Sequence, residues 1–177
     1  MTTGWCRITV PRLTIFGDQP SEITEWDTGE LMGPEEQQIV ELARLCRTTQ
    51  SLDYQVGPAL ICEDFDVTEI VTTDAQVLFS PIRLAAMIRM TMHLATIPSY
   101  TPLFGDARLF MQTRGMAKGT MTDDRLKLAG MYTAGSDHER DATRHAIMGL
   151  RRAKQKPDIR LAMWGPHARS LCGRVPI

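Results

Sequence analysis

The chain has 177 residues, a formal net charge of −1, 43% hydrophobic residues and 23% charged residues. These values exclude a wholly disordered, collagen-like or coiled-coil chain, and at this length we expect residues 1–177 to form a single domain. Because no run of 18 uncharged apolar residues occurs and the first residues lack the pattern of a signal peptide, neither a membrane-spanning helix nor a leader is predicted.

The small net charge hides a large asymmetry along the chain. Residues 1–105 hold 14 acidic residues, 6 arginines and no lysine, a net of −8. Residues 106–177 hold 7 acidic and 14 basic residues, a net of +7. This division makes charged surfaces the most informative feature of the sequence.

The first third of the chain predicts one strand, one loop and one helix. Apolar residues alternate with polar ones over residues 5–16, and Pro11 shifts the phase, so we expect an edge strand or a bulged strand. Residues 17–33 are acidic and rich in turn formers, which predicts a loop. Residues 34–47 begin with a proline and two glutamates and end on arginine, the pattern of a capped helix.

The middle of the chain predicts short strands and a buried helix. Ala59 to Cys62 and Phe65 to Val71 are both typical of strands. Residues 80–97 form a helix that is apolar around nearly its whole circumference, and such a helix is expected at the centre of a domain.

The last third predicts a hairpin, a third helix and a final strand. Residues 107–114 and 125–133 alternate as strands joined by a polar, glycine-containing connection. Ser136 and Glu139 form a capping box for a helix that Pro157 ends.

Residues 158–164 alternate again, which predicts a last strand, and residues 165–177 are expected to form a loose tail. About three helices packed on a small, mainly antiparallel sheet are therefore expected. This is a single compact domain of the α+β class.

No sequence motif indicates catalysis. The four cysteines are scattered singly, and no nucleotide-binding loop or nucleophile motif occurs, so we predict a non-enzymatic protein with no cofactor. His138, Asp141 and His145 share one face of the third helix and could hold a divalent ion. Arg144 and Arg152 on the same face would repel a cation, so a solvated polar face is the favoured interpretation. An enzyme whose site is assembled from distant residues stays an alternative.

Two charged groups are predicted to bind partners. A basic cluster on and after the third helix is expected to bind the phosphates of nucleic acid or of anionic lipids; it comprises Arg140, Arg144, Arg151, Arg152, Lys154, Lys156 and Arg160. An acidic segment with one tryptophan is expected to mediate self-association with the basic region of a second copy; it comprises Asp18, Glu22, Glu25, Trp26, Asp27, Glu30, Glu35 and Glu36.

In outline the chain resembles the matrix proteins of plant-infecting rhabdoviruses of the cytorhabdovirus type. The resemblance rests on Trp5 with the strand Cys6-Arg7-Ile8-Thr9-Val10, on the helical segments Glu35 to Arg47 and Pro81 to Ile97, and on the basic carboxy-terminal part. The chain departs from the longer animal-virus matrix proteins because it has neither a lysine-rich amino-terminal arm nor a proline-rich budding peptide.

The resemblance implies a viral structural protein that self-associates and bridges the nucleocapsid and an anionic membrane surface. It would lie in the host cytoplasm and in the virion, peripheral to the membrane, with possible non-specific contact to RNA. A nucleic-acid-binding accessory protein that uses the basic helix is the alternative function.

Overall fold

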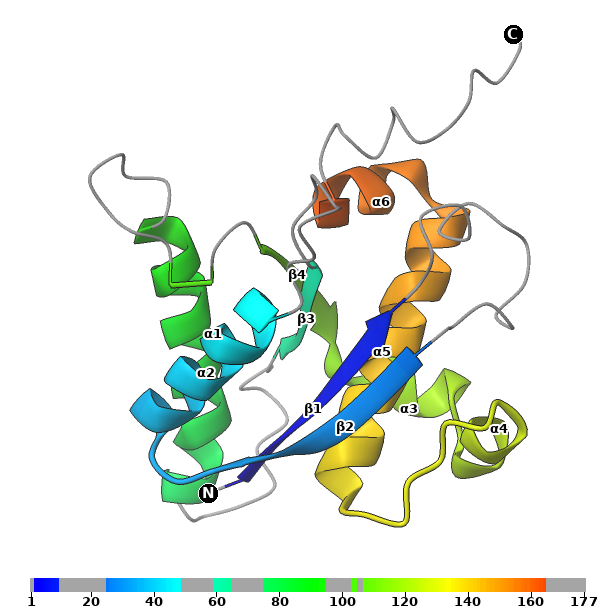
Figure 1. Ribbon diagram of the computed structural model, residues 1–177, viewed down its shortest axis with the longest axis horizontal. Helices are drawn as coiled ribbons and strands as arrows, with labels where there is room; N and C mark the ends of the chain where they lie inside the picture. The colour runs from blue at the N-terminus through cyan, green and yellow to red at the C-terminus, as the bar shows by residue number, and fades with distance from the viewer. Residues whose placement is uncertain are drawn as a thin grey trace, which may run out of the picture.

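The computed structural model describes residues 2–9, 25–48, 59–64, 75–94, 103–104 and 107–164 (Figure 1). Their elements in chain order are β1 (Thr2–Thr9), β2 (Glu25–Met32), α1 (Glu35–Thr48), β3 (Ala59–Asp64), α2 (Ala75–Leu94), β4 (Arg108–Thr113), α3 (Arg114–Thr120), α4 (Asp123–Leu128), α5 (Asp137–Gln155) and α6 (Pro157–Trp164). The predicted α+β class is confirmed. The described residues form six helices rather than three, and two separate two-stranded sheets, one antiparallel and one parallel.

Strands β1 and β2 form an antiparallel ladder that runs from the pair Thr2↔Met32 to the pair Thr9↔Glu25. The prediction of a loop over 17–33 is therefore wrong for residues 25–32, and residues 17–24 lie outside the described part. Strand β2 is mostly polar, so its sequence resembles that of a loop. Its glycine, Gly29, lies opposite Trp5, and a Cβ atom there would be 2.8 Å from the indole nitrogen. Residues 10–16 of the first predicted strand are also outside the description.

Strands β3 and β4 pair in parallel, and α2 lies between them in sequence, so the three elements form a β–α–β unit. The strand predicted at 107–114 is confirmed, and so is the first of the two strands expected after residue 58. The second, Phe65 to Val71, lies outside the described residues.

The parallel pair is covered on both faces. On one face Leu60, Cys62 and Leu109 pack against the buried residues of α1 and α2. On the other face Ile61 and Phe110 pack against the end of α5 and against α6. This alternation follows from the two-residue period of a strand.

Helix α1 confirms the helix predicted at 34–47. Helix α2 begins at Ala75, earlier than residue 80, and includes Pro81 within its length. It is not the central element that its composition indicated, because Leu84 and Ile88 are buried on one side while Met90 on the other side is 64% exposed. None of the described helices is both long and apolar enough to cross a membrane.

Helix α5 is the central element instead, because it contacts β1, β2, β3, α3 and α6 (Figure 1). Two glycines allow this close packing. A Cβ atom on Gly4 would lie 2.0 Å from the carbonyl oxygen of His138, and one on Gly149 would lie 2.3 Å from Cδ1 of Ile61. The helix thus lies directly on the backbone of β1 at one end and on the parallel pair further along.

The hairpin predicted across residues 107–133 is wrong, because its second half folds as α3 and α4. Thr122 caps α4 by accepting a hydrogen bond from the backbone N–H of Arg125, and two aspartates occupy the first turn. Leu126 is fully buried whereas Leu128 is 88% exposed, so the two leucines do not share a face as they would in a strand.

The strand predicted at 158–164 is also wrong, because these residues belong to α6. Pro157 occupies the first helical position and Asp158 the first turn, as is typical of a helix start. Ile159 and Met163, four residues apart, are both buried against Ala153. The predicted tail at 165–177 lies outside the described residues.

The close approach of β1 to α5 generates a stability prediction. Gly4→Ala should lower the free energy of unfolding by about 1–3 kcal/mol, because the added methyl group forces strand and helix apart. Gly119→Ala on α3, where nothing lies within 4 Å of a Cβ atom, is the control and should change stability by less than about 1 kcal/mol. Urea denaturation measures both. Equal effects of the two substitutions would contradict the packing described.

Candidate functional site

The first half of α5 is fixed to its surroundings by polar contacts. The Ser136 hydroxyl accepts a hydrogen bond from the Glu139 N–H at 3.2 Å, so the Ser136 half of the predicted capping box is confirmed. The Glu139 carboxylate accepts hydrogen bonds from Thr133 at 3.2 Å and from Thr28 of β2 at 3.4 Å. These contacts tie the start of α5 to the preceding loop and to the antiparallel pair of β1 and β2, called the hairpin below.

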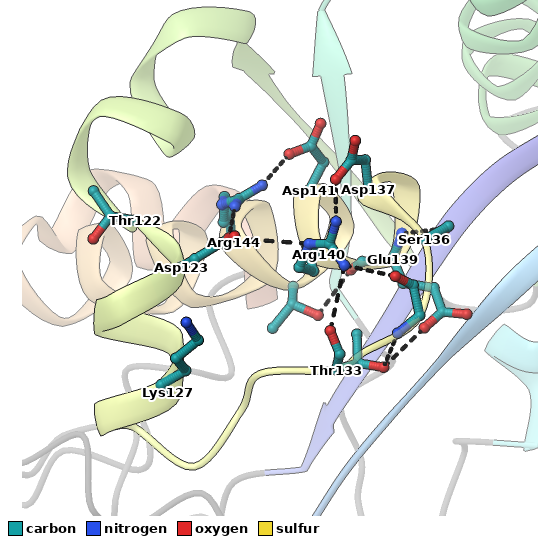
Figure 2. A network of polar contacts seen from close by, with 12 residues as sticks. Thr122, Asp123, Lys127, Thr133, Ser136, Asp137, Glu139, Arg140, Asp141 and Arg144 are labelled. Atoms are coloured by element: carbon teal, nitrogen blue, oxygen red, sulfur yellow. Dashed lines mark hydrogen bonds and ion pairs between the residues drawn. The ribbon is translucent and has the colours of Figure 1, made fainter.

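Arg144 lies at the centre of an ion-pair network between α3, α4 and α5 (Figure 2). Its guanidinium contacts the carboxylates of Asp123 and Asp141, and its Nε donates to the carbonyl of Met121 at 2.9 Å. Asp141 also pairs with Lys118 at 2.8 Å. The Arg144 side chain is only 12% exposed, so its charge is neutralised within the fold.

Arg140 extends the same network toward the loop before α5 (Figure 2). It contacts Asp137 and donates to the carbonyl of Gly135 at 2.6 Å, and its Nε lies 4.0 Å from Asp123. Its hydrogen bond to the Asp137 side chain raises the pKa of Arg140 further above its ordinary value. Tyr132 lies 5.7 Å from this guanidinium.

The structure therefore separates the seven basic residues predicted to bind an acidic partner into three groups, the last of which is Arg160 alone. Arg140 and Arg144 are neutralised by aspartates of the same chain. Residues 142–157 contain no acidic residue, so the second half of α5 has no such neutralisation from its own sequence.

We call the second group, Arg151, Arg152, Lys154 and Lys156, the basic corner. It lies where α5 ends and α6 begins. Arg151 and Lys156 form no ion pair with any carboxylate in the described part of the chain. Arg152 lies over the ring of Phe110 at 5.3 Å.

Arg160, the last of the seven, has a structural role. Its Nε donates to the carbonyl of Ala153 at 2.9 Å, and its Nη2 donates to the carbonyl of Lys154 at 3.0 Å. Since carbonyls at a helix end lack intrahelical partners, these bonds join α6 to the end of α5.

Sequence reasoning missed Arg108, the exposed first residue of β4. It is two residues before Phe110, so it lies on the sheet face that meets the basic corner. The alternation of β4 already places residues 108 and 110 on one face. The contact of that face with α5 is what brings Arg108 near the basic corner, and this contact cannot be read from the sequence.

The three residues of the possible metal site are not brought together. His138 is exposed, and Asp141 is engaged by Arg144 and Lys118. His145 is buried and faces the sheet. Across the described residues, no group of three or more histidines, cysteines, aspartates and glutamates could hold a metal ion.

His145 instead joins α5 to the parallel pair. Its Nδ1 lies 3.2 Å from Oε1 of Gln112, and its Nε2 lies 3.8 Å from Oε1 of Glu63. Glu63 and Gln112 are register partners, so both side chains point from the sheet toward the helix. Their separation in sequence hid this contact from motif analysis.

The residues predicted to form an acidic self-association face are divided among local contacts. Glu25 and Asp27 lie 4.0 and 3.6 Å from Arg7 of the neighbouring strand. Trp26 packs against the core beneath the hairpin. Glu35 pairs with Arg83 of α2 at 2.7 Å.

Two further members of that group, Glu30 and Glu36, form no ion pair within the described residues. Glu30 is half-buried on β2, and Glu36 is exposed on α1. Asp18 and Glu22 lie outside the described part of the chain. The acidic residues that the structure does describe are thus mixed with basic ones, in contrast to the basic corner.

Two of the cysteines, Cys6 and Cys46, do not have activated thiols. Burial raises the pKa of the Cys6 thiol to about 11, although a hydrogen bond with Thr143 acts in the opposite direction. Burial also raises the pKa of Cys46 to about 11. A nucleophilic cysteine needs a lowered pKa, so neither residue has that property.

Comparisons with known proteins found no matching family model, no matching curated protein and no matching solved structure. The matrix-type resemblance therefore stays a prediction.

Removing Arg144 should test the ion-pair network. Arg144→Met should lower the free energy of unfolding by about 2–3 kcal/mol, because Asp123, Asp141 and the Met121 carbonyl lose a charged donor at a largely buried position. Arg44→Met breaks the exposed pair with Glu41 and should cost less than about 1 kcal/mol. Chemical denaturation compares the two. A cost as small for Arg144 as for the control would show that the network contributes little.

The buried thiols predict a stability loss in alkali. The folded thiols keep their protons to about pH 11, whereas unfolded thiols release them near the ordinary pKa of 9.0. The resulting stabilisation is fully present below pH 9 and is lost as the pH rises toward 11. The double variant Cys6→Ala, Cys46→Ala should lose less stability between pH 8 and pH 10.5 than the unchanged protein does. An identical pH profile would contradict this.

Proposed function

We propose that the protein is a non-enzymatic structural protein that attaches to an anionic partner through the basic corner. The observation that carries the proposal is the contrast along α5. Aspartates neutralise Arg140 and Arg144, whereas Arg151 and Lys156 face no carboxylate in the described part of the chain. Cations that are not used to hold the fold together remain available to a ligand.

The chemistry of the basic corner suits a partner with many negative charges. Four cations lie within six residues at one end of a helix, and Arg108 adds a fifth from the neighbouring strand. Such a cluster attracts phosphate groups over a distance of about one Debye length, roughly 8–10 Å in physiological salt. Asp158 is the nearest acidic residue in the sequence after the cluster.

This proposal keeps one part of the matrix-type hypothesis, namely contact with a nucleocapsid or another anionic surface. Location in the host cytoplasm and the virion belongs to the same hypothesis. Self-association through an acidic face has less support, because Arg7 and Arg83 already neutralise several of the acidic residues. Assembly of copies therefore stays a secondary part of the proposal.

Heparin chromatography tests the proposed function. The double variant Arg151→Glu, Lys156→Glu should bind heparin at least about tenfold more weakly than the unchanged protein, because it reverses two cations of the basic corner. The variant Arg44→Glu, Arg47→Glu, on the exposed side of α1, changes the net charge by the same amount and is the matched control. It should elute at nearly the unchanged salt concentration.

Circular dichroism should show both variants folded. An equal loss in the two variants would mean that only net charge matters, and no loss in either would remove the basic corner as a binding site.

A further inference from the structure

Resting on the proposed function, we infer that the anionic partner is a nucleic acid, and that the basic corner holds it by its backbone phosphates without reading its bases. Three observations support this: the absence of apolar anchors at the corner, the covered state of its aromatic ring, and the spacing of its cations.

A membrane is the less suitable partner. Stable attachment of a peripheral protein takes two signals, for example a basic patch together with an apolar group that enters the bilayer. The large hydrophobic residues that the described part of the chain exposes are Met32, Val40, Met90 and Leu128. They belong to β2, α1, α2 and α4, and none of them lies on α5 or α6. Among the side chains that the structure describes, the basic corner therefore offers charge without an apolar anchor.

Among the side chains that the structure describes, base stacking has no exposed platform at this corner. Proteins that hold single strands by their bases stack them on aromatic side chains. Phe110 is the aromatic residue that the structure places here, and it is half-buried. Arg152 covers its ring at 5.3 Å. The contacts that remain available are those from cations to phosphates.

The arrangement of the cations sets the size of the contact. Arg151 and Lys154, three residues apart on α5, lie on neighbouring helical turns, and Lys156 follows the helix as its C-cap residue with an extended backbone. The three basic-corner cations on α5 span about 5 Å of the helix axis, and Lys156 lies just beyond them. A short array of this kind reaches only a few phosphates, on the order of three to four. Binding should therefore be weak, independent of sequence and strongly dependent on salt.

Fluorescence anisotropy with labelled RNA tests the inference. The probes are a 20-nucleotide poly-U strand, a mixed-sequence strand of the same length and an RNA duplex, each titrated between 50 and 200 mM salt. Affinities for the two single strands should agree within about twofold. The logarithm of the binding constant should fall against that of the salt concentration with a slope of about −2 to −3, as expected for three to four phosphate contacts to single strands.

Substitutions and vesicles provide the comparisons. Arg151→Gln should reduce the steepness of this slope by roughly one contact, whereas Arg44→Gln on α1 should leave it unchanged. Vesicles of phosphatidylcholine with 30% phosphatidylserine should bind more weakly than the RNA, measured by sedimentation at the same salt.

A preference of more than about tenfold for one RNA sequence would overturn the absence of base readout. Vesicle binding as strong as or stronger than RNA binding would overturn the choice of a nucleic acid, while the proposed attachment through the basic corner would stand. If the unchanged protein bound none of heparin, RNA and vesicles, both proposals would be overturned.

Discussion

The close contact of α5 with β1 is the constraint on which the rest of the structure depends. At Gly4 the strand lies against the backbone of the helix start, and at Gly149 the helix lies against Ile61 of the parallel pair. Because side-chain volume is absent at both points, one helix can touch two sheets. The hairpin, the parallel pair, α3 and α6 are all positioned relative to it.

The same helix separates charge that stabilises the fold from charge that is available for binding. Near its start, arginines are held by aspartates from two elements, α4 and α5 itself, and stabilise the packing of α4 on α5. The second half of α5 contains no acidic residue, and Arg151 there forms no ion pair with a carboxylate in the described part of the chain. The two halves of the helix therefore differ in how their cations are neutralised, because aspartates lie beside the first half.

Sequence patterns predicted the elements that carry a strong local signal. The cap at Ser136 and the acidic first turn of α1 were such signals, and both helices are present. The patterns failed where a segment was short. The alternation over residues 125–133 and 158–164 is too short to distinguish a strand from a helical turn. Both segments contain helices, which bury Leu126 and Ile159.

The candidate site could be predicted only in part, for a related reason. The run of basic residues after residue 139 was visible in the sequence. The neutralisation of Arg144, however, depends on Asp123 in a different helix. The position of Arg108 beside the basic corner likewise depends on the pairing of β4 with β3. Such information lies in tertiary contacts, which a residue pattern does not contain.

The contact between Gly4 and His138 also has a consequence for how the chain folds. It joins the first described strand to a helix near the end of the described chain, so the contact is highly non-local. Contacts of this kind slow folding because a long loop must close before they form. During synthesis the main packing partner of β1, helix α5, is absent until it has left the ribosome. We therefore expect the amino-terminal half to be the part that is most exposed to aggregation or to chaperones while the chain is being made.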